Sequence, residues 1–325
     1  AALVTTTDYA DAAEADLAIE AVFEDLNAKR TVFKDLSAVM RPDALLATNT
    51  SYIDPNEIFD GVPHLDRCLG IHFFSPAHIM KLVEVVRAQH TSATTLATAF
   101  AFAKALRKTP VLAGVCDGFI GNRILASYRR AAEYLIADGA LPFEVDAAMR
   151  AFGMAMGPFE AQDQSGLQIA YANRQRQSAT RDPQERYVPI MDRLCEAERF
   201  GRRSGAGWYS YADGKTPTRD PVVEEMILAY AKDCGIERRT FSTEDIQNHI
   251  LAAMANEGAR LVDEGIAETL GAVDVVKTAG YGFPRHRGGP MHWADAQGAD
   301  AIRAILTEMD ALSAGSWIRA ARYED

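Results

Sequence analysis

The sequence predicts an α/β domain with a mainly parallel sheet, followed by two helical domains. Three observations carry this prediction. Strand-like and helix-like stretches alternate up to Val115, as they do in βαβ units. Helical patterns dominate from Asp117 onward, and the helical part contains an internal repeat. We place the three domains at residues 1–112, 113–215 and 216–325.

The elements of the first domain follow from hydrophobic patterning. Apolar runs predict strands at 16–22, 44–48, 68–74, 82–86 and 111–115. Residues 25–40 and 92–108 have the period of a helix, and Ser92 or Thr91 suits the N-cap of the second. The strand–helix–strand successions at 16–48 and 82–115 fit βαβ units on a mainly parallel sheet, and a loop containing Ser75-Pro76 joins the strands at 68–74 and 82–86.

The helical part begins after these strands. Helices are predicted at 120–138, 143–152, 164–176, 221–234, 243–264 and 300–312. The stretch 200–220 is rich in Gly, Ser, Asp and Pro and predicts a turn-rich connector. The pattern G-P-x4-D-x2-G occurs at Gly157 and again at Gly289, each time after a helix that ends in an acidic-Gly pair. Duplication explains this better than two helices that merely end alike.

Composition limits the classes of function. A net charge of −11 argues against broad binding to nucleic acid or anionic membranes, which need basic surfaces. The four cysteines are widely spaced and match no metal-ligand pattern, so no metal site is predicted and the thiols fit a reducing compartment. No apolar run approaches the ~20 residues of a spanning helix. We expect a cytoplasmic protein with no membrane span.

His72 is the first candidate for chemistry. It lies in the otherwise apolar stretch Gly70–Phe74, where a histidine alone is more often a satisfied core residue. Strand alternation puts Glu84 on the same face as Leu82 and Val86, where a carboxylate needs a partner. If the two strands are neighbours, the pair can act as a general base. A purely structural His–Glu pair is the alternative.

Polar residues follow other predicted strands. Asn49 and Ser51 come after the strand at 44–48, where open α/β sheets place their ligands, although both residues also favour ordinary turns. Asn122 lies in the first turn of a helix, as a cap or as a residue facing a cleft. Glu24 and Lys29 open the helix after the first strand. Because the two residues are five positions apart, their side chains do not lie well on one helix face. They face either a ligand at the edge of the sheet or, if the first turn of the helix is solvated, water.

Seven ordered motifs of this chain resemble the 3-hydroxyacyl-CoA dehydrogenase family, from Asp16 to the end. They are DLAIEAV at 16–22, ATNTS at 47–51, GIHFFSP at 70–76, MKLVEV at 80–85, DGFIGNR at 117–123, GMAMGPF at 153–159 and GAGWY at 205–209. The resemblance implies that residues 1–112 are the C-terminal part of a Rossmann-like doubly wound sheet that binds NAD. The two duplicated all-helical domains would be dehydrogenase C-terminal domains.

The resemblance also implies a role for each candidate. His72 would be the general base for the 3-hydroxyl, and Glu84 would orient it. Ser51 would bind the substrate oxygen and help to place the nicotinamide, and Asn122 would position the substrate and the histidine. Glu24, Lys29 and Asn49 would line the nicotinamide and its ribose. The implied reaction converts an (S)-3-hydroxyacyl-CoA and NAD to a 3-ketoacyl-CoA and NADH.

The second helical stretch, with its GYGFP at 280–284 and RGGP at 287–290, resembles multifunctional fatty-acid β-oxidation enzymes. We therefore expect an acyl-CoA thioester as substrate, and a crotonase-like enoyl-CoA hydratase domain or a thiolase subunit of the same pathway as partner. No glycine-rich phosphate loop follows a strand here, so we expect a truncated chain that binds NAD poorly. The alternatives are a short-chain 3-hydroxybutyryl-CoA dehydrogenase and a non-catalytic assembly fragment.

Overall fold

The structure is a computed structural model that describes residues 3–313 and 315–324. The chain divides into two compact units. The first, here called the sheet unit, comprises residues 1–123 and 261–281, and the second, the helical unit, comprises 124–260 and 282–325. The predicted succession of an α/β part and an all-helical part is confirmed.

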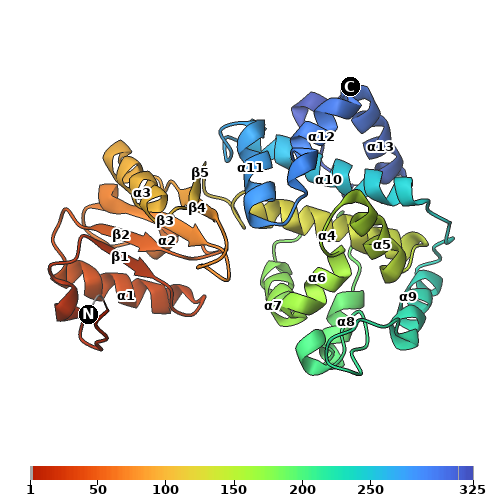
Figure 1. Cartoon of the computed structure of the whole chain (residues 1–325), viewed down its shortest axis with the longest axis horizontal. Helices are drawn as coiled ribbons and strands as arrows, with labels where there is room; N and C mark the ends of the chain where they lie inside the picture. Colours follow the sequence, from red (N-terminus) through yellow and green to blue (C-terminus); the bar gives the residue numbers. More distant parts are fainter. Residues whose placement is uncertain (1–2, 314, 325) are drawn as a thin grey trace. The chain divides into compact units, whose positions relative to one another are not determined.

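The sheet unit is built on five strands in the order β1-β2-β3-β4-β5 (Figure 1). Their bounds are β1 Leu17–Glu20, β2 Leu45–Thr48, β3 Cys68–Phe73, β4 Leu82–Val86 and β5 Thr109–Ala113. All neighbours are parallel except β3 and β4. This pair reverses direction because only residues 74–81 join the strands, which is too short for a helical crossover.

The last strand begins two residues earlier than the predicted 111–115, at Thr109. The shift has a physical reason. The strand contains Pro110, and a proline in a sequence usually indicates that a strand does not extend through it, so the predicted start was placed after this residue. Because β5 is at the edge of the sheet, the missing N–H of Pro110 is tolerated there.

Helices cover both faces of the sheet. α1 (Leu26–Val39) and α2 (Pro55–Ile58) cover one face, and α3 (Ala93–Ala105) covers the other (Figure 1). Strand alternation separates the two cores. One core groups Phe33 and Leu36 of α1 with Leu46 and Cys68. The second core contains Ala47, Leu69, Ile71, Val83, Val85, Leu96, Ala99 and Ala103.

The N-caps explain where the helices of this unit begin. Asp25 accepts the backbone N–H of Ala28 at 2.8 Å and starts α1. Ser92, not Thr91, accepts the N–H of Thr95 at 3.1 Å and starts α3. The side chain of Thr91 instead donates to the carbonyl of Cys68.

A segment from the far end of the chain also packs in the sheet unit. α11 (Leu270–Gly280) lies against β4 and β5, and an added Cβ at Gly280 would overlap the side chain of Leu82. The N–H of Gly114 donates to the carbonyl of Ile266 at 2.8 Å. Residues 261–281 thus complete the unit that contains the sheet, which the sequence pattern did not predict.

The remaining α-helices run from α4, whose first turn belongs to the sheet unit, to the C-terminal region. They are α4 Gly121–Asp138, α5 Pro142–Phe152, α6 Pro158–Ser165, α7 Leu167–Gln177, α8 Ile190–Glu196, α9 Pro221–Asp233, α10 Thr243–Asp263, α12 Pro290–Gln297 and α13 Ala299–Leu312. Short 3-10 turns are Tyr9–Ala12, Leu65–Arg67, Arg202–Ser204, Arg285–Arg287 and Ala321–Tyr323.

The helix predicted at 164–176 corresponds to α7, which starts three residues later than predicted, and the preceding α6 was not predicted. Gly166 has a φ of 91° and divides this region into α6 and α7. A glycine readily adopts this conformation, so the helical period can continue across a break in the backbone. The connector at 200–220 contains no α-helix, as predicted.

The two Gly-Pro motifs both begin a helix with proline in its first turn, at Pro158 and Pro290. Their acids have different surroundings. Asp163 is buried and accepts the N–H groups of Trp208 and Tyr209, whereas Asp295 pairs with Arg322 near the surface. The duplication of the helical domain stays a prediction.

Within the described residues, no helix is both long enough and apolar enough to cross a membrane.

Candidate active site

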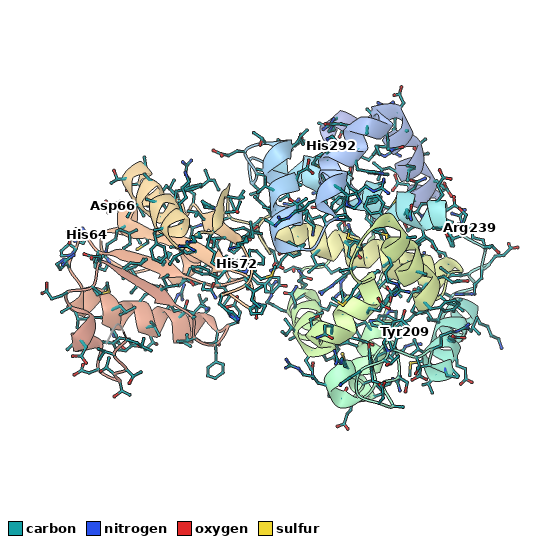
Figure 2. The ribbon with its side chains drawn as sticks, in the orientation of Figure 1. His64, Asp66, His72, Tyr209, Arg239 and His292 are labelled. Carbon is teal, nitrogen blue, oxygen red and sulfur yellow. The ribbon has the colours of Figure 1, made fainter. Side chains whose placement is uncertain are left out.

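The carboxyl ends of three parallel strands bring most of the predicted site residues to one edge of the sheet. Glu24 follows β1, Asn49 and Ser51 follow β2, and His72 lies near the end of β3. Figure 2 shows His72 toward this end of the sheet, with His64 and Asp66 at the opposite end of β3. Open α/β sheets bind their ligands at this edge.

His72 and Glu84 are directly opposite each other in the antiparallel pair of β3 and β4. The ring Nδ1 of His72 is 2.8 Å from Oε2 of Glu84, and both side chains are buried. The second carboxylate oxygen, Oε1, accepts the N–H of Gly121 at 2.9 Å and that of Ile120 at 3.2 Å, where α4 begins. Glu84 therefore accepts hydrogen bonds from the N-terminus of a helix. Because Nδ1 of His72 is paired with Glu84, Nε2 is the ring nitrogen that can make other contacts.

The other ring nitrogen of His72 faces Ser51. Oγ of Ser51 lies 3.2 Å from Nε2 of His72. The rings of Phe74 and Phe119 lie beside the imidazole, with centroids at 4.5 and 5.7 Å. Phe119 is buried and has a φ of 49°, a conformation that is uncommon and costly for a residue with a large side chain. The imidazole thus lies between apolar rings, with the hydroxyl of Ser51 as a polar neighbour of Nε2.

Asn49 connects the ends of three strands. Its Oδ1 accepts the N–H of Phe73 at 2.8 Å, and its own N–H donates to the carbonyl of Glu20 at 2.9 Å. The amide oxygen therefore holds the loop after β2 against the end of β3, and the amide nitrogen is the end of this side chain available to a ligand.

Glu24 and Lys29 form an ion pair. Glu24 precedes the N-cap Asp25, so it is not part of the helix, and the expected mismatch of helix faces does not apply. Nζ of Lys29 is 3.1 Å from Oε2 of Glu24 and 2.8 Å from Oε1 of Glu20. Lys29 is buried at 1% exposure, which contradicts a solvated first turn at this residue.

The carboxylate of Glu24 also holds the loop that carries Ser51. Its Oε1 accepts the hydroxyl of Thr50 at 2.6 Å and the N–H of Ser51 at 2.9 Å. Burial acts to raise the pKa of Glu24, but the hydrogen bonds from Thr50 and Ser51 and the charge of Lys29 together hold this pKa below its ordinary value. The acid is consequently charged at neutral pH.

The sequence reasoning predicted Asn122 but missed two residues of this arrangement, Glu20 and Tyr281. Glu20 is the acid inside the first apolar run, and its Oε2 accepts the hydroxyl of Thr48 at 2.7 Å. An acid in a buried strand was the available signal for it. Asn122 accepts the hydroxyl of Tyr281 on Oδ1 at 2.8 Å, and no local pattern connects two residues so far apart in the chain.

Burial raises the pKa of Cys116 to about 11, which makes its thiol a poor nucleophile. No group of three His, Cys, Asp or Glu side chains in the described part of the chain is placed to hold a metal ion.

Comparison with known proteins places this geometry in a family. Residues 1–116 match the NAD binding domain of 3-hydroxyacyl-CoA dehydrogenase, and residues 118–211 and 246–322 match its C-terminal domain. The chain belongs to the 3-hydroxyacyl-CoA dehydrogenase family. Its match to the first domain confirms the predicted NAD-binding fold, and the family confirms the predicted enzyme class.

The peroxisomal bifunctional enzyme of Cavia porcellus is one similar protein. It is 41% identical to this chain, and the match covers 90% of this chain and 42% of that protein. The chain thus spans less than half of that relative. The dehydrogenase part of multifunctional enzyme 1 from C. elegans has a TM-score of 0.69 at 30% identity, over 98% of this chain and 73% of that structure. A 3-hydroxybutyryl-CoA dehydrogenase from Escherichia coli shares the fold, with a TM-score of 0.80 at 24% identity over 98% and 81% of the two chains.

Proposed function

We propose that this chain catalyses the NAD-dependent oxidation of (S)-3-hydroxyacyl-CoA to 3-ketoacyl-CoA in fatty-acid β-oxidation, with His72 and Glu84 as the general base. The observation that carries the proposal is the buried hydrogen bond of 2.8 Å between Nδ1 of His72 and Oε2 of Glu84. Family membership supplies the class of reaction.

The proton step follows from the orientation of the ring. In the neutral ring, the hydrogen on Nδ1 is donated to Glu84, which leaves the lone pair of Nε2 to accept the proton of the 3-hydroxyl group. The positive imidazolium that forms is stabilised by the Glu84 carboxylate, which keeps its two backbone donors throughout. Ser51, at 3.2 Å from Nε2, is placed to hydrogen-bond the same substrate oxygen.

NAD, when bound, supplies the acceptor for the hydride that leaves C3 of the substrate. The residues at the sheet edge fit the nicotinamide end of this cofactor, because they offer hydroxyl, amide and charged groups beside His72. Ser51 and Asn49 would bind the nicotinamide and its ribose through a hydroxyl and an amide nitrogen. The Glu24–Lys29 pair would line the same place and keep the loop of Ser51 in position.

The larger protein and its partners are a separate proposal. The relative from Cavia porcellus is named a bifunctional enzyme, and this chain covers 42% of it. We propose that an enoyl-CoA hydratase domain accompanies the dehydrogenase part, that a thiolase of the same pathway takes its product, and that the substrate is an acyl-CoA thioester. The cytoplasmic location stays a prediction, and that relative is named peroxisomal.

A wide separation of His72 and Glu84 would have favoured the assembly-fragment alternative, but the two side chains are in direct contact. The short-chain alternative has weaker support. The (S)-3-hydroxybutyryl-CoA dehydrogenase PaaH1 of Ralstonia eutropha is 32% identical and covers 64% of this chain, whereas the bifunctional relative is 41% identical and covers 90% of it.

The test is the effect of His72→Gln on NADH formation from NAD and an (S)-3-hydroxyacyl-CoA. We expect turnover to fall by about 10²–10⁴-fold, which is the contribution of a general base. The matched control is His90→Gln, because His90 is exposed in the turn between β4 and α3 and should be without effect. Equal activity of the two variants would contradict the proposal.

A further inference from the structure

Tyr281, directly after α11, contacts the residues around the proposed site. Its hydroxyl donates to Oδ1 of Asn122 at 2.8 Å, and its ring lies against Gly121, where an added Cβ would overlap it. The ring of Phe74 is edge-on to it at 5.3 Å, and Nζ of the buried Lys277 lies 3.9 Å from the ring centroid. The tyrosine is therefore held on several sides, within the sheet unit.

The hydrogen bond from Tyr281 determines which end of the Asn122 amide is available. A side-chain amide has one acceptor oxygen and one amino group with two donors. Because Oδ1 of Asn122 accepts the tyrosine hydroxyl, the amino group Nδ2 is the end left to donate to a ligand. Without the tyrosine hydroxyl, this hydrogen bond no longer opposes rotation of the Asn122 amide group, which would exchange Oδ1 and Nδ2.

Asn122 is also coupled to the His72–Glu84 pair through the backbone. The preceding residue, Gly121, donates its N–H to Oε1 of Glu84 at 2.9 Å. The Tyr281 ring packs on the same Gly121. One aromatic residue thus fixes both the amide of Asn122 and the turn that holds the catalytic carboxylate.

We propose that Tyr281 is a positioning residue for the dehydrogenase reaction, which holds Asn122 so that Nδ2 donates a hydrogen bond to the substrate oxygen. The inference rests on the proposed function and deepens it. It gives the C-terminal part of the chain, residues 261–281, a direct role in the site in addition to packing against β4 and β5. The oxygen at C3 carries more negative charge once His72 has taken its proton, so a donor fixed in advance favours the reaction.

The first test is Tyr281→Phe, which removes the hydroxyl and keeps the ring and its packing. We expect kcat to fall about tenfold, because one hydrogen bond of ordinary strength is lost, while KM for NAD changes less than about twofold and the melting temperature falls by no more than about 4 °C. Tyr9→Phe is the matched control, since Tyr9 is 41% exposed and outside the site. Wild-type kcat in Tyr281→Phe would overturn the proposal.

A double-mutant cycle separates positioning from packing. In an Asn122→Ala background, Tyr281→Phe should change kcat by less than about twofold, because the tyrosine acts through the amide. A full tenfold loss in both backgrounds would show that the hydroxyl acts elsewhere. Asn122→Asp keeps the acceptor for Tyr281 and removes the Nδ2 donor, so its kcat should fall as far as that of Asn122→Ala. An Asn122→Asp variant with wild-type kcat would equally overturn the proposal.

Failure of this inference is distinguishable from failure of the proposed function. If His72→Gln loses activity as expected and Tyr281→Phe does not, only the role of Tyr281 is wrong. If the unaltered protein does not oxidise any (S)-3-hydroxyacyl-CoA with NAD, or if His72→Gln is fully active, the proposed function itself is wrong.

Discussion

The carboxylate of Glu84 accepts the ring N–H of His72 at 2.8 Å with one oxygen and two backbone N–H groups at the start of α4 with the other. The pairing of β3 with β4 sets this relationship, because His72 and Glu84 are register partners. These three donors satisfy the hydrogen-bonding capacity of the buried carboxylate and fix its orientation. The carboxylate therefore keeps the imidazole in one tautomer and compensates the charge that the ring gains with a proton.

Glu84→Gln tests this role of the carboxylate. The amide keeps much of the shape but carries no charge, and its nitrogen cannot accept from the backbone donors of α4. We expect kcat to fall by about 10²–10⁴-fold, as in other histidine-carboxylate pairs that lose the charge. Steady-state NADH formation measures it, with Glu57→Gln as the control because Glu57 is exposed. A loss below about threefold would show that the carboxylate is only structural.

Ser51→Ala removes the hydroxyl that faces Nε2 of His72 at 3.2 Å. We expect kcat/KM for the acyl-CoA substrate to fall about tenfold, the value of one hydrogen bond of roughly 1.4 kcal/mol. The variant should keep its stability, because the backbone N–H of Ser51, which donates to Glu24, is unaffected. An unchanged kcat/KM would show that the Ser51 hydroxyl does not bind the substrate.

Lys29→Met should destabilise the fold. Lys29 is buried and pairs with the buried Glu20 at 2.8 Å, so its removal leaves an uncompensated carboxylate in the core. Breaking such a pair costs about 3–5 kcal/mol. Urea unfolding measures the change, and Lys34→Met in the same helix is the control because Lys34 is exposed. A change below about 1 kcal/mol would mean that Glu20 finds another partner.

The stability contributed by Glu24 should depend on pH. Its pKa in the folded protein is lowered, so its contribution is present above the ordinary value of 4.5 and is lost as the pH falls through the folded value. Glu24→Gln should therefore be less stable than the unaltered protein at pH 7, by about 1 kcal/mol, and the difference should shrink progressively below pH 4.5. Chemical unfolding at a series of pH values measures this, and a constant difference at all pH values would contradict the charge-based account.

Local patterns were sufficient to predict the five strands of the sheet, several of the helices and the residues that meet at the candidate site. β4 has the predicted bounds because all its residues are buried, and alternation placed Glu84 on the correct face. The neighbouring strand then identified His72 as its partner. The position of Ser51 followed from a general property of parallel sheets, whose carboxyl ends meet at one edge.

Contacts between distant parts of the chain were not predictable in this way. Tyr281 reaches Asn122 only because α11 packs against β4 and β5, and no periodicity in residues 261–281 indicates that partner. The break at Gly166 was missed for a different reason, since a positive φ leaves no trace in hydrophobic spacing. Glu24 was assigned to the start of α1, whereas the adjacent acid, Asp25, is the N-cap of this helix.

The central claim is that His72 removes the substrate proton, and a single-turnover experiment with His72→Gln tests it most directly. Excess protein in saturating NAD is mixed with an (S)-3-hydroxyacyl-CoA, and the rate of NADH formation is followed together with the affinity for substrate. We predict a rate lower by about 10²–10⁴-fold with substrate affinity within about threefold of the unaltered protein. A single-turnover rate close to that of the unaltered protein would contradict the account.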